Sequence, residues 1–377
     1  MNTVLTIIPS LYGGGAEKVA ADISFKLSEK YNHKMLLYNI EGDKYNYSAD
    51  LTELNISNKR SLLGKIARQI NIFRKILDFK KINKPRITIS HMLMANMLNV
   101  LTKKKDKTIC ILHGEWSVKT GNSKILDKFV KRQYAKADMI ISVSQYIKNM
   151  FDNYYKLSIP HKVVYAGVDI QQINKKANEI ISIDLPKNYL VYVAGFRPVK
   201  NHQQLIKQLE SYLKKTDTHL VLVGDGELRL EIEEIVKKLG LSEKIHLLGN
   251  LTNPYPIIKM ATLSLLVSST ESFSLVVVES MVVGTPVIAT DCGGPREIID
   301  PEWSNKRITP YETAYGVLID KPKQWNKKSL ILQVDKLLND NNFRDRLSKN
   351  GKERAKEFSL SKTVKDLEFV INNLINK

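Results

Sequence analysis

Two glutamates, Glu271 and Glu279, flank an apolar segment and are the side chains best placed for chemistry in this sequence. The segment reads ESFSLVVVE, which places Glu271 on a loop and Glu279 one to two turns inside the next helix. Ser272 or Ser274 is expected to cap that helix. Its free amides would bind a phosphate, and the carboxylates would accept hydrogen bonds from sugar hydroxyls. A surface position for Glu279 is the alternative, but its valine neighbours indicate a buried helix, where a carboxylate needs a partner.

Two cations, Arg197 and Lys200, lie in the loop after the apolar run 189–193. The loop reads GFRPVKNH and opens a helix, an arrangement that would neutralise a diphosphate. Two solvated charges are the alternative. A second tight turn, Gly224-Asp225-Gly226, follows the next apolar run, and alone it indicates little beyond a turn.

The N-terminal half carries a triple glycine and a histidine in comparable positions. Gly13, Gly14 and Gly15 open a helix soon after the first apolar run, so the backbone there could approach an anion closely. Their spacing is not GxGxxG, which argues against a dinucleotide site, and a plain turn is the alternative. His113 ends the run 108–112 and could hydrogen-bond a ligand or transfer a proton, although a structural histidine is equally expected.

Short apolar runs that alternate with amphipathic stretches would position all of these residues. This pattern predicts buried parallel sheets in two doubly wound α/β domains, joined within residues 167–188. In such sheets ligands bind beyond the carboxyl ends of the strands, where the residues above are found. The expected strands are residues 4–9, 35–40, 87–91, 108–112, 139–143 and 162–165, then 189–193, 219–223, 245–248, 263–267, 286–289 and 316–319.

Length and composition exclude several classes of protein. The 377 residues are 43% hydrophobic and 26% charged, which rules out a disordered tail or a fibrous repeat. Two distant cysteines argue against a disulfide scaffold or a zinc module. The N-terminus does not read as a signal peptide, and no apolar run reaches the ~18 residues that a membrane span requires. We therefore expect a soluble or peripheral protein.

The charge of +19 is concentrated in the N-terminal half. Residues 1–170 hold 28 Lys and Arg against 14 Asp and Glu, which suggests an anionic partner such as phosphate, membrane or nucleic acid. The spacing in residues 61–81 predicts an amphipathic helix whose stripe is expected to pack on the sheet. Its cations could dock on anionic lipid together with Lys103-Lys104-Lys105 and with Lys128, Lys131, Arg132 and Lys136, and a solvated basic face is the alternative. The stripe comprises Leu62, Ile66, Ile70, Phe73 and Leu77.

Taken together, these motifs resemble the retaining GT-B glycosyltransferases of family 4. The resemblance implies an α/β GT-B fold of two Rossmann-like doubly wound parallel-sheet domains facing across a cleft. Residues 1–168 would bind the acceptor, 185–360 would bind the donor, and 361–377 would form a helix crossing back to the first domain. The motifs, in the family's order, are Gly14-Gly15-Ala16-Glu17, His113, residues 165–169, Pro198-Val199-Lys200-Asn201, Gly224-Asp225-Gly226, Leu248-Gly249, and residues 271–279 with 284–288.

The same resemblance implies a role for each site residue. Glu279 would bind the ribose, Glu271 the donor sugar and Lys200 the diphosphate, with His113 near the transferred sugar. The other expected donor contacts are Gly14, Gly15, Gly226, Leu251 and the amides of Phe273, Ser274 and Leu275. Four positions depart from the family pattern: Gly195 replaces an arginine, for which Arg197 is expected to substitute, and the others are Ala166, Ser274 and Arg86.

The implied reaction is retaining transfer of a hexosyl or N-acetylhexosaminyl group from a nucleotide-diphosphate donor, with UDP favoured. The acceptor would be a glycan or lipid-linked glycan in surface polysaccharide or glycoconjugate synthesis. Cations and helix amides would replace a metal, so no cofactor is expected. The enzyme would be cytoplasmic and peripheral on the inner membrane face, without nucleic acid. Two alternatives stay open: a basic nucleic-acid- or anion-binding protein, and a GT-B relative that transfers no sugar.

Overall fold

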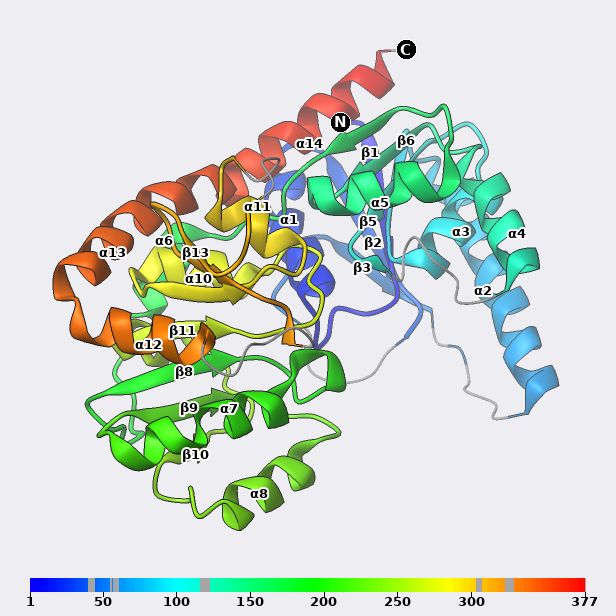
Figure 1. Ribbon diagram of the computed structural model, residues 1–377. Coiled ribbons are helices and arrows are strands. Elements are labelled where there is room, and N and C mark those ends of the chain that lie inside the picture. Colours follow the sequence, from blue (N-terminus) through cyan, green and yellow to red (C-terminus); the bar gives the residue numbers. More distant parts are fainter. Residues whose placement is uncertain are drawn as a thin grey trace. The chain divides into compact units, whose positions relative to one another are not determined.

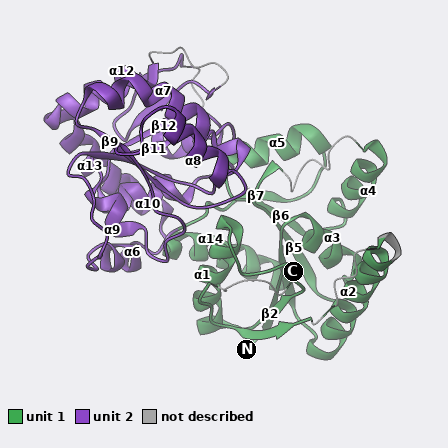
Figure 2. Cartoon of the chain, turned by 90° about the horizontal axis from the view of Figure 1, so that it is seen from below, with its two compact units in different colours: residues 1–167, 360–377 green, residues 168–359 purple. Residues whose placement is uncertain are grey.

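The chain forms two compact units, each built around its own sheet. The computed structural model describes residues 1–39, 45–54, 56, 61–115, 123–302, 307–322 and 329–376, with the backbone alone at 62 and 63 (Figure 1). Unit 1 comprises residues 1–167 and 360–377, and unit 2 comprises residues 168–359 (Figure 2). The last helix of the chain therefore belongs to the same unit as the first strand.

Within its described residues, unit 1 contains a seven-stranded parallel sheet in the order β3-β2-β1-β4-β5-β6-β7. Its central strands are almost entirely buried, because helices lie over both faces of the sheet (Figure 1). The strands are β1 (Thr3–Ile8), β2 (Asn32–Leu37), β3 (Asp50–Glu53), β4 (Ile87–His91), β5 (Lys107–Leu112), β6 (Met139–Ser142) and β7 (His161–Val163).

The helices of unit 1 include one from the end of the chain. This helix, α14, is tied to the rest of the unit by a Lys30–Glu368 ion pair of 2.7 Å and by the Thr363 hydroxyl, which donates to the Tyr165 carbonyl. It lies beside α1 in Figure 1. The helices are α1 (Gly15–Lys30), α2 (Leu62–Asn83), α3 (Leu93–Leu101), α4 (Lys124–Tyr134), α5 (Gln145–Tyr155) and α14 (Leu360–Ile375).

Helix α2 does not bury the whole stripe that the sequence predicts. Phe73 packs on the core, but Ile66 and Ile70 are 53% and 48% exposed, so the prediction is wrong for these two isoleucines. The face that packs inward instead carries Ile72 and Ile76, which are completely buried.

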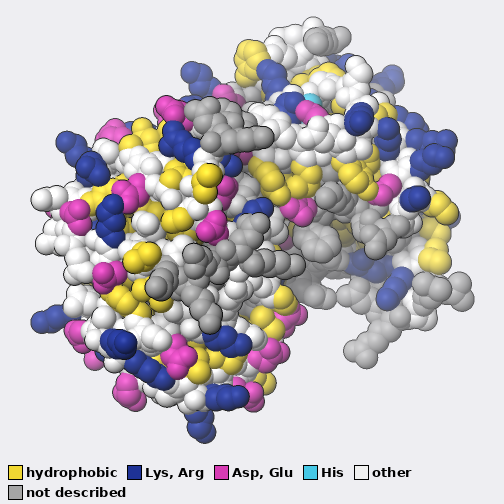
Figure 3. Space-filling view, in the orientation of Figure 1, with side chains coloured by type: hydrophobic (Ala, Val, Ile, Leu, Met, Phe, Trp, Pro, Cys, Tyr) yellow, Lys and Arg dark blue, Asp and Glu magenta, His cyan; other side chains and the backbone are white. Residues whose placement is uncertain are grey.

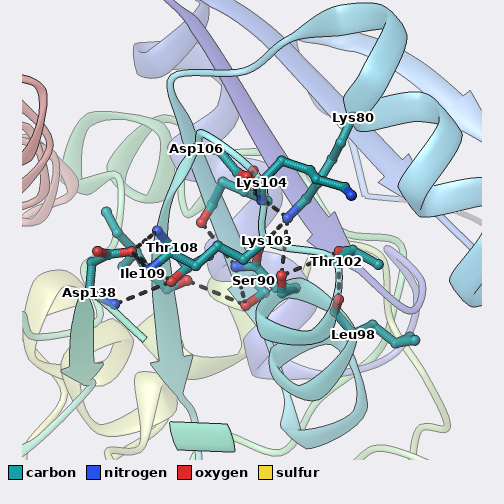
Figure 4. Close-up of polar contacts among 12 residues, drawn as sticks. Lys80, Ser90, Leu98, Thr102, Lys103, Lys104, Asp106, Thr108, Ile109 and Asp138 are labelled. Atoms are coloured by element: carbon teal, nitrogen blue, oxygen red, sulfur yellow. Dashed lines mark hydrogen bonds and ion pairs between the residues drawn. The ribbon is translucent and has the colours of Figure 1, made fainter. Parts of the chain in front are cut away.

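A buried ion pair fixes the rotation of α2. Lys80, one turn beyond Ile76, lies 2.8 Å from Asp106 in the interior (Figure 4). It also donates to the side chain of Asn99. Burial lowers the pKa of Lys80, and Asp106 opposes that shift. Because an unpaired charge inside a protein is costly, this contact holds the Lys80 face of α2 against the sheet.

Unit 2 repeats the arrangement among its described residues, with the order β10-β9-β8-β11-β12-β14-β13. All neighbours are parallel except β13 and β14. The strands are β8 (Tyr189–Val193), β9 (His219–Val223), β10 (Ile245–Leu247), β11 (Leu263–Leu266), β12 (Val287–Thr290), β13 (Tyr311–Glu312) and β14 (Val317–Ile319). The helices are α6 (Ile170–Lys176), α7 (His202–Lys215), α8 (Arg229–Lys238), α9 (Tyr255–Met260), α10 (Leu275–Val283), α11 (Gly294–Ile299), α12 (Ser329–Asn339) and α13 (Asn341–Ala355).

The strand orders confirm the prediction of two doubly wound α/β sheets. In each sheet the order reverses once, between β1 and β4 in unit 1 and between β8 and β11 in unit 2. The connections from these neighbouring strands leave in opposite directions and open a crevice at their carboxyl ends. Separately, none of the helices that the structure describes combines the length and apolar character needed to cross a bilayer.

Candidate active site

The Glu271 loop follows β11 and is held by the loop that follows β12. The Glu271 amide donates to the Cys292 carbonyl at 3.0 Å, and the Gly294 amide donates to the Glu271 carbonyl at 2.9 Å. The two loops touch so closely that a Cβ on Gly294 would lie 2.5 Å from the Ser272 carbonyl oxygen. Only glycine fits there, and the backbone of Glu271 is consequently fixed on both sides.

Glu271 forms an ion pair with Lys200 at the crevice of unit 2. The Lys200 Nζ lies 2.5 Å from the Glu271 Oε1, and the Ser268 hydroxyl donates to the same oxygen at 2.7 Å. Lys200 ends a short 3₁₀ turn, Pro198–Lys200, after β8, whereas Glu271 follows β11. The pair therefore joins the two loops that flank the reversal of strand order, and both side chains are partly exposed to solvent.

Further hydrogen bonds tie the β8 loop to the β11 loop beneath this pair. The buried Tyr192 hydroxyl donates to the Lys200 carbonyl at 2.9 Å and lies 3.4 Å from the Ser268 hydroxyl. The side-chain amide of Asn201 donates to the Val267 carbonyl at 2.9 Å. The lysine and the glutamate are thus anchored to the same rigid edge of the sheet, which reduces the reorganisation needed when a charged ligand binds.

Glu279 lies one turn inside α10 and is only 6% exposed. The Tyr255 hydroxyl donates to its Oε1 at 3.3 Å. The predicted capping of α10 by a serine side chain is wrong, because Ser274 occupies the N-cap position without a side-chain hydrogen bond. Ser274 instead adopts φ 86°, a left-handed conformation that is strained for a residue other than glycine. Leu275 begins the helix, and Phe273 before it is buried against Phe358.

The Gly226 turn supports the cationic loop directly. The Phe196 amide donates to the Asp225 carbonyl at 2.9 Å, and a Cβ on Gly226 would lie 2.7 Å from the Phe196 carbonyl oxygen. Close backbone contact therefore explains the glycine. Arg197 is exposed on the same loop, and its Nε would lie 3.9 Å from a Cβ built on Gly195. Leu251 packs against the apolar cluster of β8 and β9.

In unit 1, His113 contacts a second histidine that the sequence analysis did not select. His91 ends β4, His113 follows β5, and their ring nitrogens Nδ1 and Nε2 lie 2.8 Å apart with the rings stacked. Burial lowers the pKa of His113 to about 4 and, together with the neighbouring imidazole, holds the pKa of His91 well below its usual value. Both rings are therefore neutral near pH 7, and one donates a hydrogen bond to the other.

The glycine segment of unit 1 begins α1, with Gly13 at φ 81° and Gly14 as the N-cap. The Glu17 carboxylate folds back beside Gly14, and the space that a Cβ would take at that glycine is filled by this carboxylate. The carboxylate of Glu17 thus lies beside Gly14 at the start of α1, where the sequence predicts that Gly14 and Gly15 approach the anion of a bound ligand.

The neutral histidine pair predicts that unit 1 loses stability in acid. His113 is protonated near pH 6.5 when unfolded but only near pH 4 when folded, so the unfolded state binds more protons between these values. The free energy of unfolding should fall as pH decreases, by roughly 2 kcal/mol between pH 7.5 and 5 for this group. Urea titrations of wild type and His113→Gln should show the shallower pH slope in the variant. Parallel slopes would contradict the assignment.

The structure thus gathers the predicted site residues in two places. Lys200, Arg197, Glu271, Glu279, Gly226, Leu251, Phe273, Ser274 and Leu275 belong to unit 2, and His113, Gly14 and Gly15 belong to unit 1. The sequence analysis missed Tyr192, Ser268 and His91, although a polar residue within or just after an apolar strand is a usable signal. Within the described part of the chain, no three His, Cys, Asp or Glu side chains form a group that could hold a metal.

Comparisons with known proteins identify the family. The family described as "Glycosyl transferases group 1" matches residues 173–354, and "Glycosyltransferase Family 4" matches residues 13–172. A glycosyltransferase of Methanocaldococcus jannaschii without an assigned reaction is 31% identical over 80% of this chain and 82% of its own. A Campylobacter jejuni relative is 28% identical over 95% and 96% of the two chains. It is named N-acetylgalactosamine-N,N'-diacetylbacillosaminyl-diphospho-undecaprenol 4-alpha-N-acetylgalactosaminyltransferase.

Solved structures share the fold over the full length. Sucrose-phosphate synthase from Thermosynechococcus elongatus is 15% identical with a TM-score of 0.79 over all of both chains. Anabaena HepE, solved in complex with UDP, is 16% identical with a TM-score of 0.77 over 99% of this chain and 100% of its own. With its two doubly wound sheets and both family matches, the chain is a GT-B glycosyltransferase of family 4.

Proposed function

We propose that this glycosyltransferase is a retaining enzyme that moves a hexosyl or N-acetylhexosaminyl group from a UDP-linked donor to a hydroxyl of a lipid-linked glycan. The Lys200–Glu271 pair at the crevice of unit 2 carries the proposal, because it offers a cation for a diphosphate beside an acceptor for sugar hydroxyls. The name of the Campylobacter relative, whose substrate is linked to undecaprenol through a diphosphate, supports the acceptor class. The UDP bound to HepE supports the nucleotide.

The donor would lie along α10 in this proposal. Glu279, buried in the first turns of the helix, would bind the ribose hydroxyls in place of part of its present hydrogen bonding. The amides of Phe273, Ser274 and Leu275 would bind the sugar and phosphate at the helix start. Leu251 would contact the base, and Gly226 would hold the β8 loop in position. Gly14 and Gly15 would be further donor contacts.

Transfer would proceed with retention at the anomeric carbon. The bond from this carbon to the diphosphate breaks, and the acceptor oxygen bonds to the carbon on the same face of the sugar. The hydroxyl proton passes to a phosphate oxygen of the leaving diphosphate, so no enzyme nucleophile is needed. Lys200, Arg197 and the α10 amides would stabilise the leaving charge without a metal, and Glu271 and His113 would orient the sugar. EDTA should consequently leave the rate unchanged.

Arg197 is expected to supply the guanidinium that family members carry at the position of Gly195. Its Nε lies beside the direction that a Gly195 side chain would take, and a Cβ there would meet nothing closer than 3.6 Å. Arg197→Ala should lower kcat/KM about 10- to 100-fold, since a charged hydrogen bond is lost. The double variant Gly195→Arg/Arg197→Ala should recover most of this loss. Wild-type kinetics in Arg197→Ala would remove Arg197 from the site.

A nucleotide-sugar panel tests the proposal as a whole. Thermal shifts should select one donor, and NMR of the product made with a polyprenyl-diphosphate glycan should show the donor's own anomeric configuration. Glu279→Gln is the matched variant, because it keeps the size of the side chain and removes its charge. A product with inverted anomeric configuration would contradict the retaining mechanism. Undiminished donor binding by Glu279→Gln would contradict the ribose assignment.

The lipid-linked acceptor implies a place for the enzyme in the cell. Unit 1 holds 31 Lys and Arg against 15 Asp and Glu, a charge of +16, whereas unit 2 holds 27 against 24, a charge of +3. A strongly cationic unit is attracted to the anionic inner leaflet of a membrane. We therefore propose that the enzyme is peripheral on the cytoplasmic face, where its acceptor would lie.

A further inference from the structure

Helix α4 of unit 1 exposes large apolar side chains that nothing in the described structure covers. Ile125 is 85% exposed, Leu126 44% and Phe129 41%. The opposite face is anchored in the core through Val130 and Tyr134, which are at most 1% exposed. The helix is therefore firmly held, and its apolar residues cannot turn inward to escape water.

Cations surround these apolar side chains. Ile125 and Phe129 are one turn apart, and the same row continues along the helix as Arg132, with Lys136 just beyond the end of the helix. The single acid of α4, Asp127, lies toward α5, where the Tyr154 hydroxyl donates to it at 2.5 Å. On the face drawn in Figure 3, Lys and Arg side chains gather over unit 1 with hydrophobic ones between them. The exposed cations of α4 and the residues just after it are Lys124, Lys128, Lys131, Arg132 and Lys136.

We propose that α4 is the segment through which this enzyme docks on an anionic lipid bilayer. Ile125, Leu126 and Phe129 would enter the headgroup region with the helix axis parallel to the membrane plane, and the cations would contact lipid phosphates. The inference deepens the proposed function, whose lipid-linked acceptor requires a membrane-bound enzyme, by naming the docking helix.

Charge favours a bilayer over a second copy of the chain. In an isologous dimer through α4, the five cations of one copy would face the five cations of the other. Unit 1 of each copy carries a charge of +16. Like charges at such a contact repel, whereas an anionic leaflet neutralises them. The exposed isoleucines of α2, Ile66 and Ile70, are a smaller apolar site, and α2 and α4 are both neighbours of α3 in Figures 1 and 2.

Vesicle co-sedimentation of the full chain tests the proposal. Wild type should bind phosphatidylcholine vesicles that contain about 30% phosphatidylglycerol and should bind pure phosphatidylcholine weakly. Ile125→Ser/Phe129→Ser should lower the partition coefficient at least about tenfold. Lys131→Gln/Arg132→Gln should lower it about fivefold per charge at low salt, and this difference should vanish at high salt. Leu230→Ser, at a helical leucine of unit 2 that is 74% exposed, is the matched control and should bind like wild type.

A spectroscopic variant locates the contact. The native chain contains three tryptophans, so both variants are made in a background in which these are replaced by phenylalanine. In anionic vesicles the tryptophan introduced by Phe129→Trp should shift its fluorescence to the blue and be quenched by brominated lipid, whereas that of Leu230→Trp should do neither. Equal vesicle binding by Ile125→Ser/Phe129→Ser and wild type, or no quenching of the tryptophan in Phe129→Trp, would overturn the proposal. A dimer in sedimentation velocity that Ile125→Ser/Phe129→Ser converts to a monomer, with vesicle binding intact, would assign α4 to self-association instead.

Activity with a water-soluble acceptor separates this inference from the proposed function. Ile125→Ser/Phe129→Ser should transfer sugar to a short-chain acceptor at the wild-type rate while losing transfer to acceptor embedded in vesicles. Vesicle binding through α4 in an enzyme that transfers no sugar to any acceptor would refute the function and leave the docking helix standing.

Discussion

Lys200→Ala is expected to lower kcat/KM for sugar transfer about 10²–10³-fold. The Lys200 Nζ lies 2.5 Å from Glu271 at the crevice of unit 2, so the ammonium is already in place before a donor arrives. The backbone carbonyl of Lys200 is also fixed, because the Tyr192 hydroxyl donates to it. Removing the ammonium takes away a preorganised charge that would oppose the negative charge growing on the diphosphate. Steady-state kinetics with the donor identified by thermal shift measure the loss.

Lys207→Ala is the matched control for this experiment. Lys207 is an exposed lysine on α7, the helix that follows the Lys200 loop, and it has no place in the proposed site. Its replacement should leave kcat/KM within about twofold of wild type, as surface substitutions commonly do. If Lys200→Ala matched Lys207→Ala in rate, the diphosphate assignment would have to be abandoned.

Gly294→Ala should damage both stability and sugar transfer although it adds a single methyl group. The new Cβ would lie 2.5 Å from the Ser272 carbonyl oxygen and 2.6 Å from the Phe273 amide nitrogen, both backbone atoms that cannot rotate away. The Glu271 loop must shift to make room. We expect a loss of about 1–3 kcal/mol in the free energy of unfolding and at least about 100-fold in kcat/KM. Urea unfolding and kinetics of the purified variant measure the two effects.

Gly351→Ala provides the contrast within the same unit. Gly351 lies inside α13, and a Cβ there would meet Met281 at ordinary distances of 3.4 Å and more. Alanine should therefore stabilise the helix, by up to about 1 kcal/mol, without changing kcat/KM. Equal behaviour of the two alanine variants would show that the contact between Gly294 and the Glu271 loop does not matter.

Much of the fold follows from the pattern of apolar runs. All twelve predicted strands correspond to strands of the two sheets, and residues 87–91, 189–193 and 219–223 match β4, β8 and β9 to the residue. The two that escaped prediction, β3 (Asp50–Glu53) and β13 (Tyr311–Glu312), are edge strands. Their sequences DLTE and YE lack the continuous apolar character of a strand buried on both faces, so the pattern contains no signal for them.

The site was predicted less completely than the fold. The sequence assigns Lys200 and Glu271 to different parts of a donor, whereas the structure pairs them directly. Sequence separation hides this contact, because it depends on which strands adjoin at the reversal of strand order. Likewise the side chain of Ser268 contacts Glu271, and the His91 ring contacts His113. A polar residue at the end of a strand is visible in the sequence, but its partner is not.

Helix α2 shows where periodicity alone misleads. The stripe that includes Ile66 and Ile70 has good helical spacing, yet the helix turns Ile72, Ile76 and Lys80 inward. A scale of hydrophobicity counts Lys80 as a surface residue. Only the position of Asp106, 26 residues later, reverses that expectation by pairing with it inside the unit.

The attachment of α14 to the first unit has a consequence for biosynthesis. Leu360 follows all 192 residues of 168–359, so the ribosome must finish the second unit before the first can acquire its last helix. Until then the surface around Tyr31 and Tyr165 lacks the helix that covers it, so the first unit stays incomplete throughout the synthesis of the second. The unit that is synthesised first therefore cannot complete its fold until residues 168–359 have been made.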